Sequence, residues 1–337
     1  MSNNTFGMDL GTNNIKIYNK AEDSFFLEKN MIAIENKNTL LAYGDSAFDM
    51  YEKAPANIRT SYPVCNGVIA DIKNMETLVK YFIMDQSKGM LKPCDFYVAV
   101  PTDVTEVEKR AFYDLIKDAG VKARKIMVVE KAVADGLGLG IDVKNSQGVL
   151  VVNVGYATTE ISILSLGGIV LSKLIKVGGH KFDEAIRMGV RNEYNLIIGE
   201  KSAEKIKINL SELESSDQSA LVYGRDIVTG LPIEKMIPTE LVDASLKDHF
   251  ITIIDSIKVI LERTPPELGA DIYRHGIYLT GGASQVNHFA EMVQKGTGLK
   301  VNMAEKPLET VAIGLSKIIK DDNYKSLAYA IEGMGGR

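Results

Sequence analysis

The sequence predicts an α/β fold built from two similar halves, and three observations support this prediction. A strand, a tight turn of small residues and a second strand occupy residues 6–18, and the same plan recurs at residues 149–164. Each turn follows a short polar side chain, Asp9 in the first half and Asn153 in the second. Around these motifs, strand-like segments alternate with helical ones, which is typical of a sheet covered by helices. A plan that recurs within one chain indicates a duplicated architecture.

The first half is predicted to cover residues 1–148. Its opening hairpin joins strands at residues 6–10 and 15–18. A mixed, polar stretch at about residues 24–68 contains short strand-like runs and is predicted to be an insertion. Alternating helices and strands follow at residues 74–85, 96–100, 105–120, 125–129 and 132–139. The second of these helices starts at a capping box, in which Thr105 and Glu108 each cap the other's backbone N–H group.

The second half, residues 149–337, repeats this plan. Three consecutive strands lead into a double-glycine turn and a helix, and a second insertion is predicted at about residues 194–246. A helical pattern at residues 250–261 is stopped by Pro265 and Pro266. A short strand then runs into the small-residue turn 280–284, and the final helix, at about residues 309–319, is expected to return toward the first half. The predicted whole is two α/β domains, each with a subdomain insertion, facing each other across a cleft.

Composition narrows the function. The chain has 337 residues and a net charge of -5, so it lacks the basic surplus that a nucleic-acid binder needs. Its four histidines and its two widely spaced cysteines, Cys65 and Cys94, argue against a zinc cluster or a disulfide framework and fit a reducing cytoplasm. The first residues lack the basic and apolar regions of a secretory signal, and no apolar run is long enough to span a bilayer.

The two turns indicate a phosphate-binding site. Tight turns of small residues leave backbone N–H groups free and let phosphate oxygens approach them closely. One such turn is more often an ordinary connection between strands. Two copies in a duplicated architecture predict that a nucleotide is held from both sides.

With these motifs in place, the chain resembles the superfamily of actin, sugar kinases and heat-shock chaperones, and within it the MreB family of bacterial actins. The resemblance runs from Phe6 to about Ile319. Its most specific stretches lie mainly outside the nucleotide turns, at residues 42–45, 67–71, 165–170, 194–200, 224–232 and 264–268.

The resemblance implies that the protein binds ATP and Mg²⁺, with Asp9 holding the metal through water. The implied nucleotide contacts are Asp9, Gly11, Thr12, Asn13, Asn14, Asn153, Gly155, Tyr156, Ala157, Thr158, Glu204, Lys205, Ile206, Lys207, Gly281, Gly282, Ala283 and Ser284. Taken without the resemblance, several of these have plainer readings. Asp9 would be a turn residue, the 204–207 charges a solvated helix face, and the 280–284 segment a plain strand-to-helix turn.

The second turn departs from the family pattern Asp-Ile-Gly-Gly-Gly-Thr-Thr-Glu. Asn153 replaces a carboxylate that supports the metal's water shell, which weakens the attraction for a divalent cation. Tyr156 and Ala157 replace two glycines. Each adds a Cβ where a phosphate approaches closely, and glycine-only backbone angles become costly, by about 1 kcal/mol or more per residue, so either the turn reshapes or the phosphates sit differently.

A second departure concerns hydrolysis. The family pattern Glu-Glu-Pro-x-Ala-Ala-Ala provides a glutamate that positions the attacking water, and this chain has Glu130-Lys131-Ala132-Val133-Ala134-Asp135-Gly136. Lys131 stands at the position of that glutamate. A protonated lysine has no lone pair to orient a water, although it can bind a phosphate oxygen. Glu130 is the alternative substitute, but neighbouring residues point in different directions. A solvent-facing Lys131 is the plainer alternative. The hypothesis is slow or absent hydrolysis.

The family also implies partners. Its members form filaments, often of paired antiparallel protofilaments, on the inner face of the cytoplasmic membrane, where they organise the cell-wall elongation machinery and rod shape. An N-terminal amphipathic helix is not predicted here. Met90 and Leu91, flanked by lysines, are the candidate membrane contact, and an ordinary exposed loop is the alternative.

Three other functions stay open at this point. One is a divergent, non-hydrolysing paralogue that copolymerises with an active relative. Another is a sugar-kinase-like phosphotransferase, which would need a carboxylate base and a sugar-binding insertion. The third is a chaperone-like ATPase, for which no length remains to form a peptide-binding domain.

Overall fold

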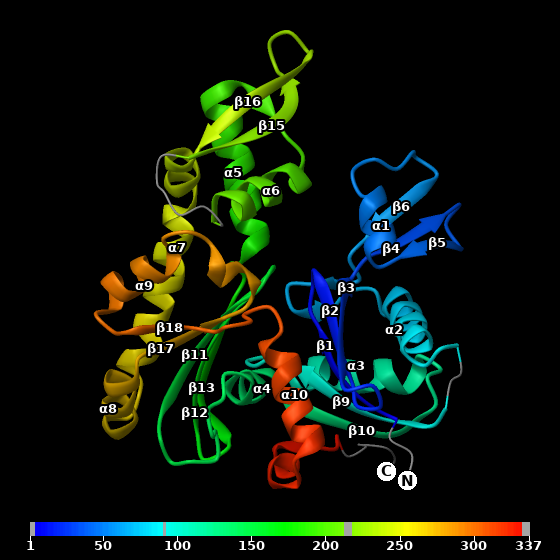
Figure 1. The fold of residues 1–337 in the computed structure, drawn as a ribbon, viewed down its shortest axis with the longest axis vertical. Helices are drawn as coiled ribbons and strands as arrows, with labels where there is room; N and C mark the ends of the chain where they lie inside the picture. The colour runs from blue at the N-terminus through cyan, green and yellow to red at the C-terminus, as the bar shows by residue number, and fades with distance from the viewer. Residues whose placement is uncertain (1–3, 90–91, 212–217, 332–337) are drawn as a thin grey trace.

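The structure is a computed structural model that describes residues 4–89, 92–211 and 218–331. It confirms the α/β prediction. Figure 1 shows two large sheets in the lower part of the molecule, each with a smaller insertion above it. The first large sheet has the strand order β19-β10-β9-β1-β2-β3. Its strands are β1 (Thr5–Leu10), β2 (Asn14–Asn19), β3 (Ser24–Lys29), β9 (Cys94–Val100), β10 (Ala123–Glu130) and β19 (Ala328–Tyr329).

The second large sheet has the order β13-β12-β11-β17-β18. Its strands are β11 (Val149–Val154), β12 (Thr159–Ser165), β13 (Gly168–Ile175), β17 (Ile277–Thr280) and β18 (Val301–Met303). The predicted duplication appears in the pairing. β1 lies antiparallel to β2 and parallel to β9, and β11 lies antiparallel to β12 and parallel to β17. The turn at the end of β1 and the turn at the end of β11 therefore have equivalent positions in the two halves.

Helices cover both faces of the first sheet because successive side chains of a strand point to opposite faces. On β9, Phe96 and Val98 join the core beneath helices α2 (Ile72–Gln86) and α3 (Glu106–Asp118). Tyr97 and Ala99 join the core beneath helices α4 (Lys131–Gly138) and α10 (Thr310–Lys320). The predicted capping box at Thr105 and Glu108 is confirmed at the start of α3.

The second sheet shares one large apolar core with its helices and with the insertion above it. The helices are α5 (Gly179–Tyr194), α7 (Thr239–Glu262), α8 (Pro266–His275) and α9 (Phe289–Thr297). The predicted helix at residues 250–261 is too short, because α7 starts at Thr239, inside the stretch predicted as an insertion. Val242 and Leu246 continue the buried face of this helix toward its N-terminus.

Each insertion is a small sheet with one helix. The first consists of β4 (Ile32–Glu35), β5 (Thr39–Tyr43), β6 (Ile58–Ser61) and α1 (Asp45–Met50). It begins at β4 and not at residue 24, because β3 extends the large sheet. The second consists of β14 (Leu196–Ile197), β15 (Ser219–Asp226), β16 (Pro232–Pro238) and α6 (Glu200–Ser211). The short elements β7 (Val64–Cys65), β8 (Val68–Ile69), η1 (Gly282–Gln285) and η2 (Asp322–Leu327) complete the described fold.

The last helix, α10, lies between the two large sheets (Figure 1). It packs on α4 and on β1 of the first half, and its apolar residues Val311, Leu315 and Ile318 belong to the core beneath α4. Among the described residues, no helix is both long and apolar enough to cross a membrane.

Candidate functional site

A cavity of about 560 Å³ lies where the turns of the two halves face each other. Its lining includes most of the predicted contacts, namely Asp9, Gly11, Thr12, Asn13, Asn14, Lys131, Asn153, Gly155, Tyr156, Ala157, Thr158, Glu204, Lys207, Gly281, Gly282 and Ala283. The cavity therefore draws on the β1–β2 turn, the β11–β12 turn, the start of α4, one face of α6 and the segment that enters η1.

Three predicted contacts do not line this cavity. On α6, Lys205 is exposed and Ile206 is buried in the core of the second half. The helical repeat accounts for this, because Glu204, Lys207 and Ile208 share one face and the residues between them do not. Ser284 is buried, and its hydroxyl donates to the Gly281 carbonyl at 2.7 Å.

Asp9, at the end of β1, is buried beside a cation that the motif did not reveal. Lys16 Nζ lies 2.9 Å from Asp9 Oδ2. Burial raises the pKa of Asp9, but the ammonium groups of Lys16 and Lys131 outweigh it and hold the pKa below its ordinary value. Asp9 is therefore an anion at neutral pH. The hairpin register could have identified Lys16, because it pairs directly with Asp9 across β1 and β2.

Lys131 points into the cavity and not into solvent, which excludes the solvent-facing alternative. Its Nζ lies 2.7 Å from Glu160 Oε1. The other Glu160 oxygen accepts the N–H and the hydroxyl of Thr102, both at 3.0 Å. Burial lowers the pKa of Lys131, but Glu160 and Asp9 outweigh it and raise the pKa above its ordinary value. The position therefore carries a permanent cation, bound to a carboxylate of the other half.

Glu130, the alternative substitute, is directed elsewhere and does not line the cavity. Its Oε1 accepts Lys109 Nζ and the Tyr329 hydroxyl, each at 2.8 Å. The reason is the one expected from the sequence, since adjacent residues at a strand-to-helix junction project in different directions. Glu130 cannot position a water in this cavity, and that alternative is wrong.

Asn153 has a carboxylate neighbour that the sequence analysis missed. Its Nδ2 donates to Asp135 Oδ2 at 2.6 Å, and Thr280 Oγ1 donates to Asp135 Oδ1 at 3.1 Å. Asp135 lies on α4 and is fully buried. Burial raises the pKa of Asp135 to about 7, although the amide of Asn153 and the charge of Lys131 lower it. No motif spacing links residues 135 and 153, because they meet only in the folded protein.

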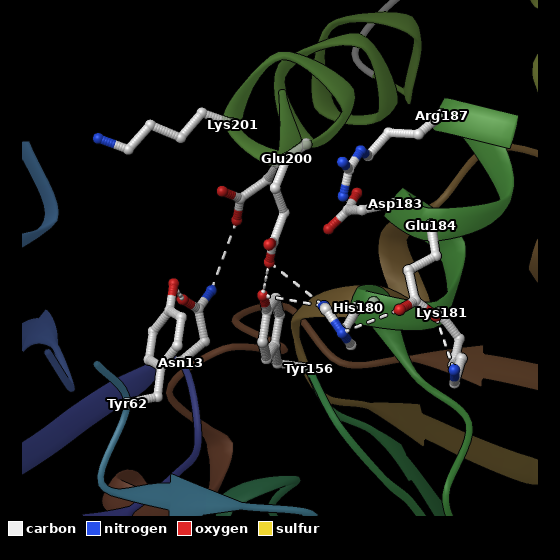
Figure 2. Close-up of polar contacts among 12 residues, drawn as sticks. Asn13, Tyr62, Tyr156, His180, Lys181, Asp183, Glu184, Arg187, Glu200 and Lys201 are labelled. Carbon is white, nitrogen blue, oxygen red and sulfur yellow. Dashed lines mark hydrogen bonds and ion pairs between the residues drawn. The ribbon is translucent and has the colours of Figure 1, made fainter. Parts of the chain in front are cut away.

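The second turn accommodates Tyr156 and Ala157 without left-handed backbone. Neither is among the described non-glycine residues with positive φ, so the expected strain is not present. The Tyr156 side chain leaves the turn toward α6, where its hydroxyl bonds Glu200 and lies 3.3 Å from His180 Nδ1 (Figure 2). The Tyr156 ring is thus directed toward α6 and away from the backbone of the β11–β12 turn.

Two further parts of the wall are fixed by local contacts. Lys207 Nζ lies 2.7 Å from Asp183 Oδ1 and donates to the Gly179 carbonyl at 3.2 Å. Gly281 has φ of +85°, and a Cβ there would lie 2.3 Å from the Val154 carbonyl oxygen. Only glycine fits between η1 and the end of β11.

The described residues contain no group of three or more His, Cys, Asp or Glu side chains that could hold a metal ion. Asp9 is the carboxylate at the end of β1, just before the first turn, and Lys16 and Lys131 place two positive charges beside it. Such a site suits a ligand that brings its own negative charges. The candidate membrane contacts, Met90 and Leu91, lie outside the described residues.

Two α/β halves of equivalent topology, with equivalent turns facing one cavity, define an actin-like protein. The family model described as "MreB/Mbl protein" matches residues 3–326, and the chain belongs to this family. It is 34% identical over 325 residues to the cell shape-determining protein Mbl of Bacillus subtilis, covering 95% of this chain and 96% of that protein. It is 33% identical over 329 residues to the cell shape-determining protein MreB of Escherichia coli, covering 95% and 94%.

Solved structures agree. MreB5 of Spiroplasma citri bound to ADP superposes with a TM-score of 0.90 at 35% identity, covering 97% of this chain and 98% of that one. The structure of the same protein bound to AMPPNP gives the same values. The MamK double helical filament, at 20% identity and a TM-score of 0.78 with 94% and 98% coverage, shares the fold.

Proposed function

We propose that this chain binds ATP with Mg²⁺ in the cavity between its halves and assembles into actin-like filaments, while hydrolysing the nucleotide slowly or not at all. The observation that carries the hydrolysis part is the Lys131–Glu160 ion pair at 2.7 Å. The binding part is supported by the MreB5 structures, which contain ADP and AMPPNP. The cell-shape role is supported by the names of the Mbl and MreB relatives.

The residues present fit a nucleoside triphosphate. The cavity volume of about 560 Å³ lies within the usual range for ligand sites. Backbone N–H groups of the two turns and the ammonium groups of Lys16 and Lys131 would meet the phosphates. Asp9 would contact Mg²⁺ through water, since this ion keeps much of its hydration and takes its remaining ligands from phosphates. Glu204 and Lys207 would face the nucleoside.

The same residues disfavour hydrolysis. A general base must accept a proton from water, and Lys131 has no lone pair to do so. Glu160 accepts three hydrogen bonds from Lys131 and Thr102, which occupy most of its acceptor sites and pair its charge with an ammonium group. Asn153 holds Asp135 away from the cavity lining. With no free carboxylate positioned for the water, phosphate release is expected to be slower by roughly two to four orders of magnitude.

The filament is proposed to lie on the inner face of the cytoplasmic membrane, to contain paired protofilaments and to organise the cell-wall elongation machinery. Heterologous, non-closing contacts between identical subunits would generate it. A paralogue that copolymerises with an active relative fits the same site and is the second candidate, favoured by Lys131. A sugar-kinase-like phosphotransferase is less favoured, because the chain belongs to the MreB/Mbl family over almost its full length.

One experiment tests the proposal. Purified protein is incubated with ATP and Mg²⁺, and pelleting and phosphate release are measured together. The expected result is polymer in the pellet with little phosphate released. The matched variant combines Lys131→Glu with Asp135→Ala, which restores the family residue at two positions and keeps the number of carboxylates on α4 unchanged. It should release phosphate faster. Release by the parent as fast as that of a relative with the glutamate would contradict the proposal.

A further inference from the structure

The mouth of the cavity is bridged by contacts between the two halves of the molecule. On the inner side, Glu204 Oε1 accepts Asn13 Nδ2 at 3.4 Å and lies 3.5 Å from Lys29 Nζ. These three residues line the cavity. Farther out, the first turn of α6 meets the segment that follows α1. Figure 2 shows Glu200 and Lys201 at the start of α6, above Asn13, Tyr62 and Tyr156.

Glu52 of the first half caps the N-terminus of α6 in the second half. The backbone N–H of Glu200 donates to Glu52 Oε1 at 2.9 Å, and that of Lys201 donates to Glu52 Oε2 at 3.3 Å. The first N–H groups of a helix have no partner within the helix, and a carboxylate is favoured there. The preceding residue, Gly199, leaves room, since a Cβ there would lie 2.7 Å from Glu52 Oε2.

Glu52 makes this contact from an unfavourable backbone conformation. Its φ is +61°, in the left-handed region that glycine tolerates and glutamate seldom adopts. Strained residues of this kind persist where the surrounding structure holds them, and they mark candidate functional positions. Glu52 is exposed, and both oxygens of its carboxylate accept N–H groups of the other half.

Two neighbouring contacts strengthen the bridge. The Tyr51 hydroxyl donates to Glu200 Oε2 at 2.8 Å. Lys201 Nζ donates to the Phe48 carbonyl and lies 4.2 Å from the centre of the Phe48 ring. On its other oxygen, Glu200 is held by Tyr156 and by His180 Nδ1 at 3.2 Å. We call Tyr51, Glu52, Glu200 and Lys201 the latch.

We propose that the latch holds the mouth of the cavity closed and retains the bound nucleotide, so that the latch must open before the nucleotide exchanges. This inference rests on the proposed function. In a chain that turns over its nucleotide slowly, release and not hydrolysis sets the lifetime of the bound state. Tyr156, at a position where the family has glycine, connects the latch to the second turn through Glu200.

The test uses Glu52→Gly. Glycine adopts a φ of +61° freely, so the substitution removes the cap without disturbing the fold. The control is Lys37→Gly, which makes the same change at another exposed, left-handed residue (φ 75°) of the same insertion. Tyr51→Phe removes only the hydroxyl. Release of a fluorescent ATP analogue is followed by stopped flow after a chase with unlabelled ATP. We expect Glu52→Gly to release it about five- to tenfold faster and Tyr51→Phe less so. The control should match the parent.

A second measurement needs no nucleotide. Spin labels at Asn38→Cys and Val228→Cys, in a Cys65→Ser background, report the distance between the two insertions. Glu52→Gly should widen or lengthen this distance distribution. If Glu52→Gly releases the analogue at the same rate as the parent, the proposal is overturned. If the parent binds no analogue, the proposed function fails, and the distances alone then decide. A widened distribution supports the latch, and an unchanged one overturns it.

Discussion

At the scale of single residues, this chain departs from the family pattern in charge at two places, at Lys131 in the cavity wall and at the buried pair of Asn153 and Asp135, of which Asn153 lines the cavity. Where the family pattern has Asp and Ala, this chain has Asn153 and Asp135, so the carboxylate has moved from β11 to α4. There it accepts the Asn153 amide and the Thr280 hydroxyl. Where the pattern has a glutamate, Lys131 pairs with Glu160. The carboxylates at this end of the cavity are thus bound to protein donors and not free for water.

Asp135 gives stability a definite pH dependence. Its pKa is raised by burial to about 7 in the folded protein, so the folded state holds this proton more tightly than the unfolded state does. Stability should therefore fall as the pH rises from about 5 to about 7, with a slope of up to about 1.4 kcal/mol per pH unit from this group. Asp183, whose pKa is raised by burial to about 6, acts in the same direction.

Urea unfolding of the parent and of Asp135→Asn across this pH range measures the effect. The amide keeps the shape of the side chain but does not titrate, so the variant should show a shallower slope. Asp255→Asn, at an exposed carboxyl on α7, is the matched control and should leave the slope unchanged. Equal slopes for the parent and Asp135→Asn would show that Asp135 is not the titrating group.

The site residues that could be predicted from the sequence belong to a motif, whereas those that could not have partners that are distant in the sequence. The two turns were found because each is a local pattern, and Lys131 was found because the family pattern has a glutamate at its position. Lys16 was missed, although strand pairing places it opposite Asp9. Asp135 and Glu52 were out of reach, because their partners are distant in the sequence and no period or motif connects them. Lys205 and Ile206 do not line the cavity because another face of α6 is turned toward it, and the motif alone does not show which face that is.

At the scale of elements, the sequence predicted the central strands and most helices, but it did not predict α8 or α9, and it misplaced a boundary where an element crosses between domains. The start of α7 was assigned to an insertion although its buried face continues through Val242 and Leu246. The glycines of α4 had no explanation from the sequence. In the structure, α4 and α10 cross with their backbones in contact, and Gly138 and Gly314 lie at the crossing.

The close crossing of α4 and α10 predicts that replacing glycine by alanine there lowers the stability of the protein, the opposite of its usual effect in a helix. At an ordinary helical site, glycine to alanine stabilises by about 1 kcal/mol. At Gly314 the new Cβ would lie 1.8 Å from the Ala134 carbonyl oxygen, so the helices must separate. Gly314→Ala should therefore destabilise by about 1–3 kcal/mol in denaturant unfolding. Gly269→Ala, in α8 with no atom within 4 Å, is the control and should stabilise. A stable Gly314→Ala protein would mean that the two helices do not touch.

At the scale of the whole molecule, the resemblance implies attachment to the inner face of the cytoplasmic membrane, and our candidate contact is the segment 87–93, which contains Met90 and Leu91. The net charge of -5 gives the molecule no general attraction to anionic lipid. Lys88, within this segment, has a side chain that is 80% exposed, but its Nζ pairs with Glu22 Oε1 at 2.8 Å. Attraction would therefore be local and weak, and insertion of the two apolar side chains would have to supplement it.

The double substitution Met90→Ser with Leu91→Ser should then abolish co-flotation with vesicles rich in anionic lipid. Neutral vesicles, or a rise in salt, should reduce binding of the parent, because the lysines contribute through charge. Leu166→Ser is the matched control, since Leu166 is an equally apolar residue, 73% exposed, in the turn between β12 and β13 of the other half. If the control lost vesicle binding as fully as the double variant, binding would depend on the total exposed apolar surface of the molecule and not on the segment 87–93. Unchanged flotation of the double variant would leave the filament without this membrane contact, and attachment would have to come from another surface of the assembled subunits.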